Sequence, residues 1–332
     1  MTTFLVAAGL VVLAMTVVDV VWTTVAAGSG AGPLTGRLSR MLWRAALRVD
    51  RSTQVSVLTP AGVLIVVTIL GAWIFMILAG WLLVFAASDG AVRHATTGVP
   101  GDLLDRILFV GYTVLTLGLG NFVPGEGAWQ IATVVATGSG LLLVTLSVTY
   151  LIPVASAVVQ RRQLAGQISS LGGSSHEIVT NGWNGSDFGS LEQNLSMLLP
   201  TLHTLRLQHL SYPVLHVFHT RSKHDAAPIS LVHLDGAVRL LRSAVHSDVR
   251  PDAQTLDALA AALGVFLDTM DGIHITDAAE PVPAPSLAPL KRAGIPVDPN
   301  SYEDAVQASE RRRRLLASYL HDDGWTIDDV RS

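Results

Sequence analysis

The chain has 332 residues, of which half are hydrophobic and only 14% are charged, and its formal net charge is −4. This composition argues against an ordinary soluble domain of this size and directs attention to membrane-spanning segments. The sequence contains no cysteine, which excludes disulfides and thiolate metal sites.

Three stretches are apolar and long enough to cross a bilayer, whose hydrocarbon core of roughly 30 Å needs about 20 helical residues. They are residues 4–27, 60–87 and 128–159. The first stretch has no basic n-region and is longer than the apolar part of a secretory signal, so we predict a membrane span within residues 1–33.

Arginines indicate the orientation of these spans. One group lies in the loop after the first span, and Arg161 and Arg162 directly follow the third span. The loop group consists of Arg37, Arg40, Arg44, Arg48 and Arg51. Because cytoplasmic loops carry the excess of Lys and Arg, we expect a multi-pass protein of the cell membrane with its N-terminus outside and its C-terminal part in the cytoplasm.

Residues 34–52 alternate apolar and arginine positions at helical spacing. This pattern predicts an amphipathic helix in the inner membrane interface, and a helix that packs between subunits is an equal alternative. Thr59 and Pro60 are expected to begin the second span as N-cap and first helical residue.

Residues 58–160 are predicted to form one unit with a short segment between its two spans. Residues 103–117 are apolar but too few to cross, which favours a re-entrant helix, with Asp102 as its cap. The segment ends in the sequence TVLTLGLGNFVP, residues 113–124. Alternating glycines permit a backbone whose carbonyl groups line up on one side, as a column that binds a dehydrated cation requires.

This motif resembles the filter of pore-loop potassium channels, which usually reads T-x-x-T-V-G-Y-G-D. The corresponding residues here are Thr113, Thr116, Leu117, Gly118, Leu119, Gly120 and Asn121. GLGNFVPGEG at 118–127 is similar to G-L-G-D-Y-V-P-G-E-G of the second pore loop in two-pore-domain potassium channels. The resemblance covers residues 60–160 and implies that Thr116 to Gly120 bind K⁺, supported by Thr113 and Asn121.

Two departures from the family pattern bear on selectivity. Leu119 stands in place of the usual Tyr, which removes an aromatic brace of the filter, and Asn121 stands in place of the usual Asp. The plainer alternative is that GLG forms a turn between an apolar helix and a loop.

Within the third span, Gly138 and Gly140 are candidates for a gating hinge that the resemblance places there, with close helix packing as the alternative. Pro153 is a further candidate as a kink at the cytoplasmic gate, and the alternative is that it marks where the helix leaves the bilayer. Asp19 is the ionisable residue inside the first span, and such residues usually face protein or water. We expect it to serve as a structural anchor, bound to Arg37 or another interfacial arginine of the same or a neighbouring subunit, or to a hydroxyl such as Thr23. Proton sensing is the alternative.

Residues 161–280 show apolar residues at intervals of three and four, which predicts a cytosolic α-helical domain. Residues 281–300 read as a proline-rich linker, and 301–332 as a last helix with Ser301 and Asp304 in a capping box. Surface and packing roles are expected for the histidines of the tail, with pH sensing and metal binding as alternatives. They are His203, His209, His216, His219, His224 and His233.

The predicted fold class is therefore an all-α membrane protein, with three transmembrane helices, a re-entrant pore loop and a cytosolic helical domain. No internal repeat is visible, so several chains are needed to build a pore, and the resemblance implies a homotetramer that conducts K⁺. No catalytic group can be assembled by spacing, and we expect neither an enzyme, nor a metal site or cofactor other than K⁺ in the filter. Membrane lipid is an expected partner and nucleic acid is not, because the tail is acidic. A weakly selective cation channel and a non-conducting sensor or scaffold are the alternative functions.

Overall fold

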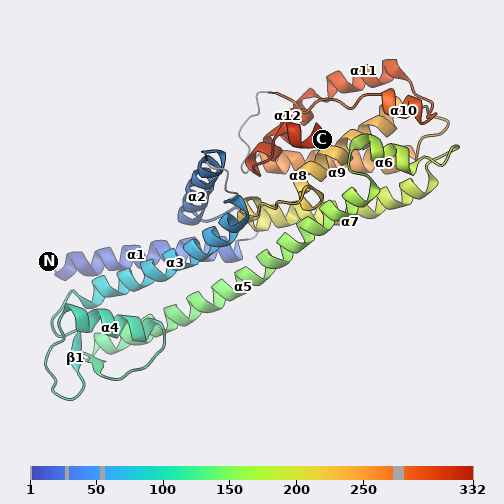
Figure 1. The fold of residues 1–332 in the computed structure, drawn as a ribbon. Coiled ribbons are helices and arrows are strands. Elements are labelled where there is room, and N and C mark those ends of the chain that lie inside the picture. The colour runs from blue at the N-terminus through green and yellow to red at the C-terminus, as the bar shows by residue number, and fades with distance from the viewer. Residues whose placement is uncertain (1, 27–29, 53–56, 272–279, 332) are drawn as a thin grey trace. The chain divides into compact units, whose positions relative to one another are not determined.

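The structure is a computed structural model that describes residues 2–26, 30–52, 57–271 and 280–331. Three of its helices are long and apolar enough to cross a membrane: α1 (Thr2–Val25), α3 (Leu58–Phe85) and α5 (Ala128–Leu171) (Figure 1). The three predicted spans are confirmed as helices. Residue 27 of the first predicted span and residues 272–279 of the predicted cytosolic domain lie outside the described residues.

The chain divides into two compact units, each of which is described by itself. The first unit comprises residues 1–42 and 64–153, and the second unit comprises residues 43–63 and 154–332. Helices α2 (Pro33–Ser52), α3 and α5 each begin in one unit and end in the other. The predicted amphipathic segment 34–52 thus forms a continuous helix.

In the first unit, glycines allow α1 and α3 to approach closely. A Cβ atom on Gly9 would lie 2.6 Å from the carbonyl oxygen of Gly80, and a Cβ atom on Gly80 would lie 2.8 Å from Cγ of Leu13. Real Cβ atoms do not approach other atoms so closely, so small residues are required at both positions. Close backbone approach through small residues is a common way to pack helices in membranes.

The short helix between the spans is α4 (Leu103–Val114), and it begins as predicted. The Asp102 carboxylate accepts a hydrogen bond from the N–H of Asp105 (2.9 Å), and the Asp105 carboxylate accepts one from the N–H of Asp102 (3.0 Å). This reciprocal capping box satisfies donors that the first helical turn leaves free. A 12-residue helix of this kind is too short to span a bilayer.

Two short strands that were not predicted lie on either side of α4 in the sequence. Strand β1 (Val92–His94) pairs antiparallel with β2 (Phe122–Pro124), so that Arg93 lies opposite Val123. Three residues are too few to show the alternation by which strands are recognised in a sequence. The pairing joins the segment before α4 to the segment after residue 121.

The predicted start of the second span is wrong by two residues. Helix α3 begins at Leu58, and the N–H of Ala61 donates to the carbonyl of Val57 at 3.2 Å. Thr59 lies inside the helix, and its buried hydroxyl has no partner among the described residues. It therefore caps nothing.

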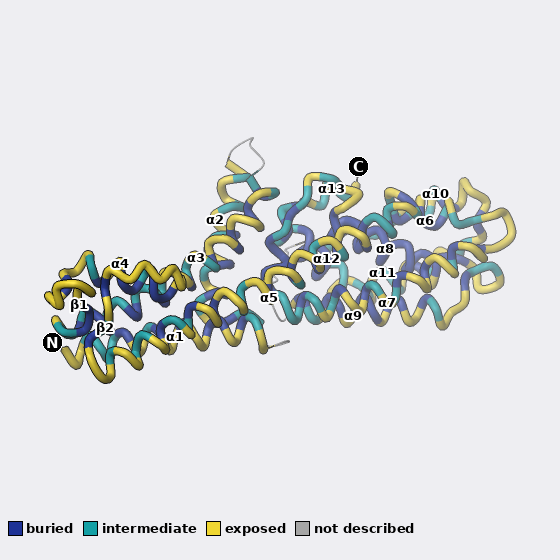
Figure 2. Tube along the Cα trace, turned by 90° about the horizontal axis from the view of Figure 1, so that it is seen from below, coloured by how far each residue is buried: buried dark blue, intermediate teal, exposed yellow. Residues whose placement is uncertain are grey.

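The second unit is helical apart from short connections. After α5 it contains α6 (Ser175–Gly182), α7 (Gly189–Ser211), α8 (Ala227–Arg239) and α9 (Ala253–Asp271). Short helical turns lie between them: η1 (Pro213–Val217), η2 (Lys223–Asp225) and η3 (Leu240–Ala244). Helix α8 is buried along its whole length, as its dark blue tube in Figure 2 shows, so it forms the centre of this core.

The periodic leucines of α7 are buried as their spacing predicts. They are Leu191, Leu195, Leu198, Leu202 and Leu205. One face of α7 thus packs into the core of the second unit, in which α7 and α9 are neighbours. The helical fold expected for this part of the chain is confirmed.

Residues 281–300 do not form a free linker. Val282 is buried, its N–H donates to the carbonyl of Arg313 (3.2 Å), and its carbonyl accepts from Arg313 (2.8 Å). Leu290 of α10 (Ala288–Arg292) and Ile295 are also in the core. The prolines favour an extended backbone, but the apolar residues between them are stabilised by burial in the core of the second unit.

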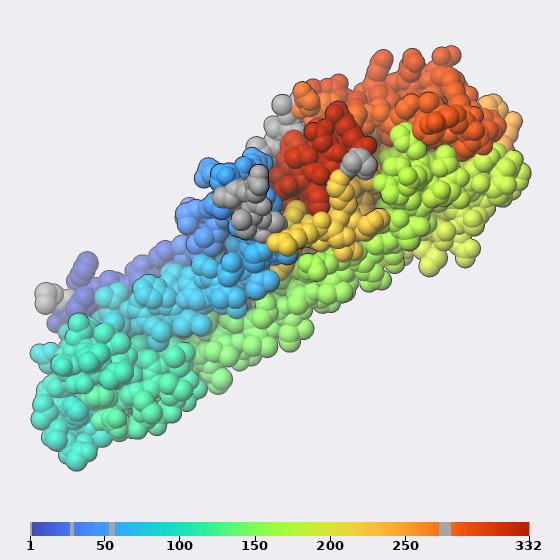
Figure 3. Space-filling model, viewed as in Figure 1, coloured from blue at the N-terminus to red at the C-terminus, as the bar shows by residue number. Residues whose placement is uncertain are grey.

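The C-terminal part forms three helices in place of the single helix predicted for 301–332. They are α11 (Pro299–Ala308), α12 (Glu310–Asp322) and α13 (Ile327–Arg331). Asp298 caps α11 by accepting from the N–H groups of Asn300 and Ser301, so the capping box predicted at Ser301 is wrong. In Figure 3 the red C-terminal residues lie against the yellow surface of the preceding helices, in agreement with the packing of α12 and α13 on α8.

Candidate functional site

The candidate site is the segment that follows the C-terminal end of α4. The helix ends at Val114, and the N–H groups of Thr116 and Leu117 turn back to the carbonyls of Thr113 (3.2 Å) and Tyr112 (2.8 Å). Residues 115–121 are all exposed, whereas Thr113 is buried on the last turn of α4. Thr113 therefore lies behind the segment, as a supporting residue would.

The backbone of this segment changes handedness at every second residue. The φ angles of Thr116, Gly118 and Gly120 are 59°, 63° and 78°, whereas Leu117 and Leu119 do not have positive φ. In an extended strand successive peptide groups face opposite sides, and a left-handed residue at every second position turns them toward the same side. The segment thus has the backbone form that a column of carbonyl oxygens needs.

Thr116 is the one residue other than glycine with positive φ in the described part of the chain. This conformation is rare for a β-branched residue and costs on the order of 1–3 kcal/mol. Such strain persists only where surrounding structure imposes it, and it is concentrated at functional sites. The location of Thr116 at the base of the predicted filter fits that rule.

A tyrosine that the sequence reading missed holds the far end of the segment. The buried Tyr112 hydroxyl donates to the carbonyl of Phe122 at 2.7 Å, which joins α4 to the first residue of β2. The Tyr112 ring meets Phe109 edge-on with centroids 5.6 Å apart, and Phe109 meets Phe85 of α3 at 5.1 Å. The aromatic residues at spacing i, i+3 on α4 were the signal that could have revealed this brace.

The start of α4 is held by Arg106, a buried arginine that the sequence reading also missed. Its guanidinium donates to the carbonyls of Gly101 (3.1 Å) and Ala86 (3.2 Å) and binds the carboxylate of Asp89 at 2.8 Å. The backbone of Asn121 is held as well, because its carbonyl accepts from the N–H of Ala95 at 3.0 Å. Both ends of the loop around α4 are thus fixed to the rest of the first unit.

The candidate hinge residues of α5 have different surroundings. A Cβ atom on Gly140 would collide with the carbonyl of Val114 at the end of α4, whereas one on Gly138 would meet open space. Close packing against α4 therefore explains Gly140 in this structure. Pro153 lies inside the helix at the last residue of the first unit, so α5 continues from one unit to the other at that point. A hinge at Gly138 or Pro153 stays a prediction.

Asp19 anchors the beginning of α2. Its fully buried carboxylate accepts hydrogen bonds from the N–H groups of Leu34 (2.7 Å) and Thr35 (3.2 Å), from the Thr35 hydroxyl (2.6 Å) and from the Trp73 indole (2.9 Å). Negative charge at a helix N-terminus is favourable, and Asp19 caps α2 from another helix. Of the expected partners, Arg37 is wrong, whereas a hydroxyl does bind Asp19, that of Thr35. The Thr23 hydroxyl instead accepts from the N–H of Gly32 at 2.9 Å.

We expect the variant Asp19→Asn to lower the stability of the protein by roughly 1–3 kcal/mol, because an amide NH₂ would then face donors that need an acceptor. The measurement is thermal unfolding of the purified protein, with Asp50→Asn at the other end of α2 as the matched control. A melting temperature equal to that of the unsubstituted protein would contradict the anchor role. An altered pH dependence of flux without any loss of stability would favour the proton-sensing alternative.

The histidines of the tail are mostly packed in the second unit. His209, His216, His219 and His233 are buried, whereas His203 and His224 are exposed. Burial, assisted by the positive charge of Arg161, lowers the pKa of His209 to about 3, so its ring stays neutral near pH 7. Among the described residues no three side chains suitable as metal ligands lie together.

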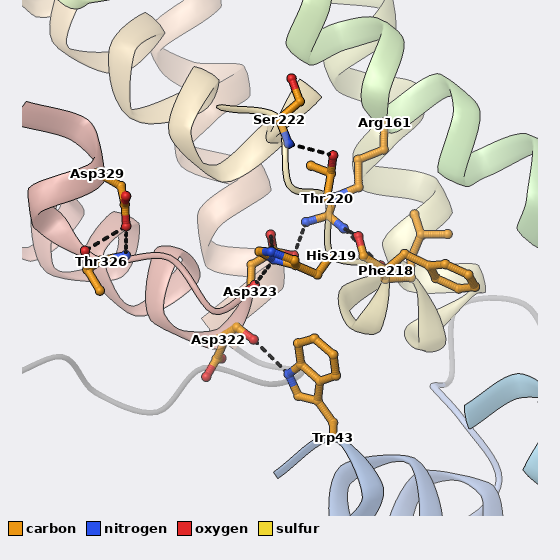
Figure 4. A network of polar contacts seen from close by, with 11 residues as sticks. Trp43, Arg161, Phe218, His219, Thr220, Ser222, Asp322, Asp323, Thr326 and Asp329 are labelled. Carbon is orange, nitrogen blue, oxygen red and sulfur yellow. Dashed lines mark hydrogen bonds and ion pairs between the residues drawn. The ribbon is translucent and has the colours of Figure 1, made fainter. Parts of the chain in front are cut away.

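The far end of α5 carries a buried ion pair in the second unit. Arg161 binds the carboxylate of Asp323 at 2.5 Å and donates to the carbonyls of Leu215 (3.2 Å) and Phe218 (2.9 Å) (Figure 4). The side chains of Arg161 and Asp323 are 5% and 3% exposed, so the pair is almost free of solvent. It joins α5 to the residue that follows α12.

Comparison with known proteins decides the family. A family model described as an ion channel matches residues 62–157, which contain α4, the segment 115–121 and the first part of α5. An uncharacterised membrane protein, YdjJ of Bacillus subtilis (strain 168), is 34% identical over 314 residues, which cover 94% of this chain and 92% of the relative.

The chain belongs to this ion channel family. The resemblance to pore-loop channels, stated from the motif at 113–124, agrees with the range that the family model covers. An ion channel family is not a class of enzymes. The similarity to the Bacillus subtilis protein extends over residues of both units. No solved structure matches the chain significantly.

We expect the variant Tyr112→Phe to weaken ion selectivity while leaving the channel folded, because it removes the hydroxyl that holds the Phe122 carbonyl. A hydrogen bond of this kind contributes roughly 0.5–1.5 kcal/mol, and the carbonyl left behind loses its partner. The permeability ratio of K⁺ to Na⁺ in planar bilayers measures the effect. Tyr150→Phe in α5 provides a control for loss of a tyrosine hydroxyl away from the filter, and an unchanged ratio in Tyr112→Phe would exclude the brace.

Proposed function

We propose that this channel is a homotetramer that conducts K⁺ passively through residues 116–120. The observation that carries the proposal is the alternation of positive φ at Thr116, Gly118 and Gly120, which favours a column of backbone carbonyl oxygens. Carbonyl oxygens aimed at one axis can replace the hydration shell of a cation. The C-terminal end of α4 directly precedes this segment, and its partial negative charge also favours a cation there.

Several copies of the chain are required because one chain supplies only one such segment. Leu117 and Leu119 of this segment are each 64% exposed in a single chain. Such exposure of apolar side chains is unfavourable unless another molecule covers them. In an assembly with four copies around a central axis, these leucines would be buried and four carbonyls would form each ring. Membrane lipid would cover the exposed apolar faces of α1, α3 and α5.

The arginines of α2 and of the end of α5 support an orientation with these groups at the cytoplasmic side. The N-terminus would then lie outside, the filter would lie near the outer surface, and the second unit would lie in the cytoplasm. Helices α2, α3 and α5 all continue into the second unit, and α5 is the one that follows the filter segment in the chain. We infer that the second unit governs gating through α5.

Potassium selectivity is supported by the resemblance of the filter and by the Tyr112 brace, which compensates in part for Leu119 in place of tyrosine. The test is the reversal potential of the purified protein in planar bilayers, with high K⁺ and low Na⁺ on one side and low K⁺ and high Na⁺ on the other. A potential close to the K⁺ equilibrium value supports the proposal. A potential near zero would support the weakly selective channel instead, and no current at all would support the non-conducting sensor.

The assembly is tested separately by the mass of the purified complex in detergent, with chemical cross-linking of the same sample. Four chains per complex is the expected result. A stable monomer that carries current would contradict the proposed arrangement, because one segment cannot surround an ion.

A further inference from the structure

The second unit contains a pocket of about 290 Å³ that the proposed conduction does not use. Its wall is formed by the beginning of α6, by α8, by residues 282–286, by α12 and by the end of α13. The volume is at the lower end of the range found for small-molecule sites in proteins. The pocket lies wholly within the second unit, so its shape depends on that unit alone.

Positive charge is in excess at the wall of this pocket. Arg239, Arg313 and Arg331 line it, and Asp235 is the one acidic residue of the lining among those described. Outside the lining, Arg331 also pairs with Asp328 at 3.2 Å, where both side chains are exposed. Asp235 is already engaged by two guanidinium groups, those of Arg239 and Arg312. One carboxylate therefore pairs directly with two arginines, and it acts on Arg313 only as a more distant charge, as Glu310 does.

Arg313 is held in the wall without a carboxylate partner. It donates to the backbone carbonyls of Val282 (2.8 Å) and Val306 (3.4 Å), and its buried Nε has no partner among the described residues. Burial, followed by the positive charge of Arg239, lowers the pKa of Arg313. Arg239 and Arg313 line the same pocket and repel each other electrostatically, and a bound anion would reduce that repulsion.

Neutral donors complete the lining. Ser174, Ser175 and Ser286 supply hydroxyl groups, and the N-terminus of α6 adds its partial positive charge. The Nε2 atom of His176, in the same wall, is buried without a hydrogen-bond partner in the described part of the chain. Phosphate oxygens accept hydrogen bonds from arginine, hydroxyl and helix N–H donors. Because they are also negatively charged, their bonds to arginine are stronger than those of a neutral polar ligand.

We propose that this pocket binds the phosphate group of a small ligand, with Arg313, Arg239 and Arg331 as its charged contacts. The inference concerns binding by the second unit and does not depend on conduction or on selectivity. The phosphate could belong to a soluble molecule or to a lipid headgroup, and the experiment below separates these two sources.

The test uses the purified full-length protein in detergent, titrated with sodium pyrophosphate at constant ionic strength, with the melting temperature and the heat of binding as readouts. A saturable rise in melting temperature with pyrophosphate, but not with sodium chloride, is the expected result. The variant Arg313→Gln should weaken binding by about tenfold or more, as expected for loss of a charge-assisted hydrogen bond. Arg331→Gln should also weaken pyrophosphate binding. Because the Arg331 side chain is exposed and does not support the core, this variant tests the proposal even if Arg313→Gln fails to fold.

Arg314→Gln is the matched control, because Arg314 follows Arg313 on α12, pairs with Glu310 at 2.5 Å and does not line the pocket. Equal loss of binding in Arg314→Gln would show a general charge effect and overturn the proposal, as would the absence of saturable stabilisation by any phosphate probe. A parallel sample in nanodiscs with or without phosphatidic acid identifies the source. Stabilisation by phosphatidic acid that depends on Arg313, without stabilisation by pyrophosphate, would assign the site to a lipid headgroup.

Discussion

Replacing Gly120 with alanine is expected to abolish ion conduction. The φ angle of Gly120 is 78°, in the left-handed region where an L-residue with a Cβ atom costs roughly 1–2 kcal/mol. Each copy of the chain in the proposed assembly would bear this cost in the same carbonyl ring. The substituted segment would relieve the strain by rotating the peptide group, which turns a carbonyl oxygen away from the ion.

The reason for this effect is backbone conformation, because a Cβ atom on Gly120 would meet no other atom within 4 Å. Gly71→Ala is therefore a sharp control. Gly71 also has open space around its Cβ position, but it lies inside α3, where alanine is the more favourable residue. K⁺ flux into liposomes should be lost in Gly120→Ala and retained in Gly71→Ala. Equal flux in both variants would exclude residues 116–120 as the filter.

The parts of the structure that could be predicted from the sequence depend on local patterns. Continuous apolar length predicted α1, α3 and α5, and the apolar segment after Asp102 predicted α4 with its cap. The candidate segment 115–121 could be located because its glycines and Thr116 are spaced as the alternating backbone requires. In each case the determining residues lie within a few positions of one another.

The features that could not be predicted join residues that are distant in sequence. Asp19 is satisfied by residues 15 and 54 positions away, at Leu34 and Trp73, and nothing in the first span identifies them. Val282 is buried in a proline-rich segment whose composition is typical of an exposed linker. The Tyr112 hydrogen bond joins the residues on either side of the segment 113–121, so its partner Phe122 is brought near only when that segment has folded.

Removing the Asp323 carboxylate is expected to destabilise the protein by about 3–5 kcal/mol, the usual cost of leaving one member of a buried ion pair without its partner. Arg161 would keep its bonds to the carbonyls of Leu215 and Phe218, but its charge would face no anion. Figure 4 shows the other polar contacts that surround this ion pair. His219 shares a hydrogen bond with the Asp323 carbonyl (2.7 Å), and the Trp43 indole of α2 donates to the carbonyl of Asp322 (2.8 Å).

Asp323→Ala is compared with Asp328→Ala, which removes the acid of an exposed pair with Arg331 and should change the melting temperature little. The double variant Arg161→Met with Asp323→Leu removes both charges and should recover part of the loss, because apolar replacements of a buried pair are often tolerated. The recovery should be incomplete, since the carbonyls of Leu215 and Phe218 lose their donor. A melting temperature of Asp323→Ala equal to that of Asp328→Ala would contradict the role of the pair.

The same variants separate gating from permeation, because Arg161 lies on the helix that continues from the first unit while Asp323 directly follows α12. If α5 transmits the state of the second unit to the pore, Asp323→Ala changes the open probability and leaves the ratio of K⁺ to Na⁺ permeability unchanged. Gly120→Ala changes permeation itself. A change of selectivity in Asp323→Ala, at an open probability equal to that of the unsubstituted channel, would mean that the pair acts on the filter and that α5 does not serve as the gating connection.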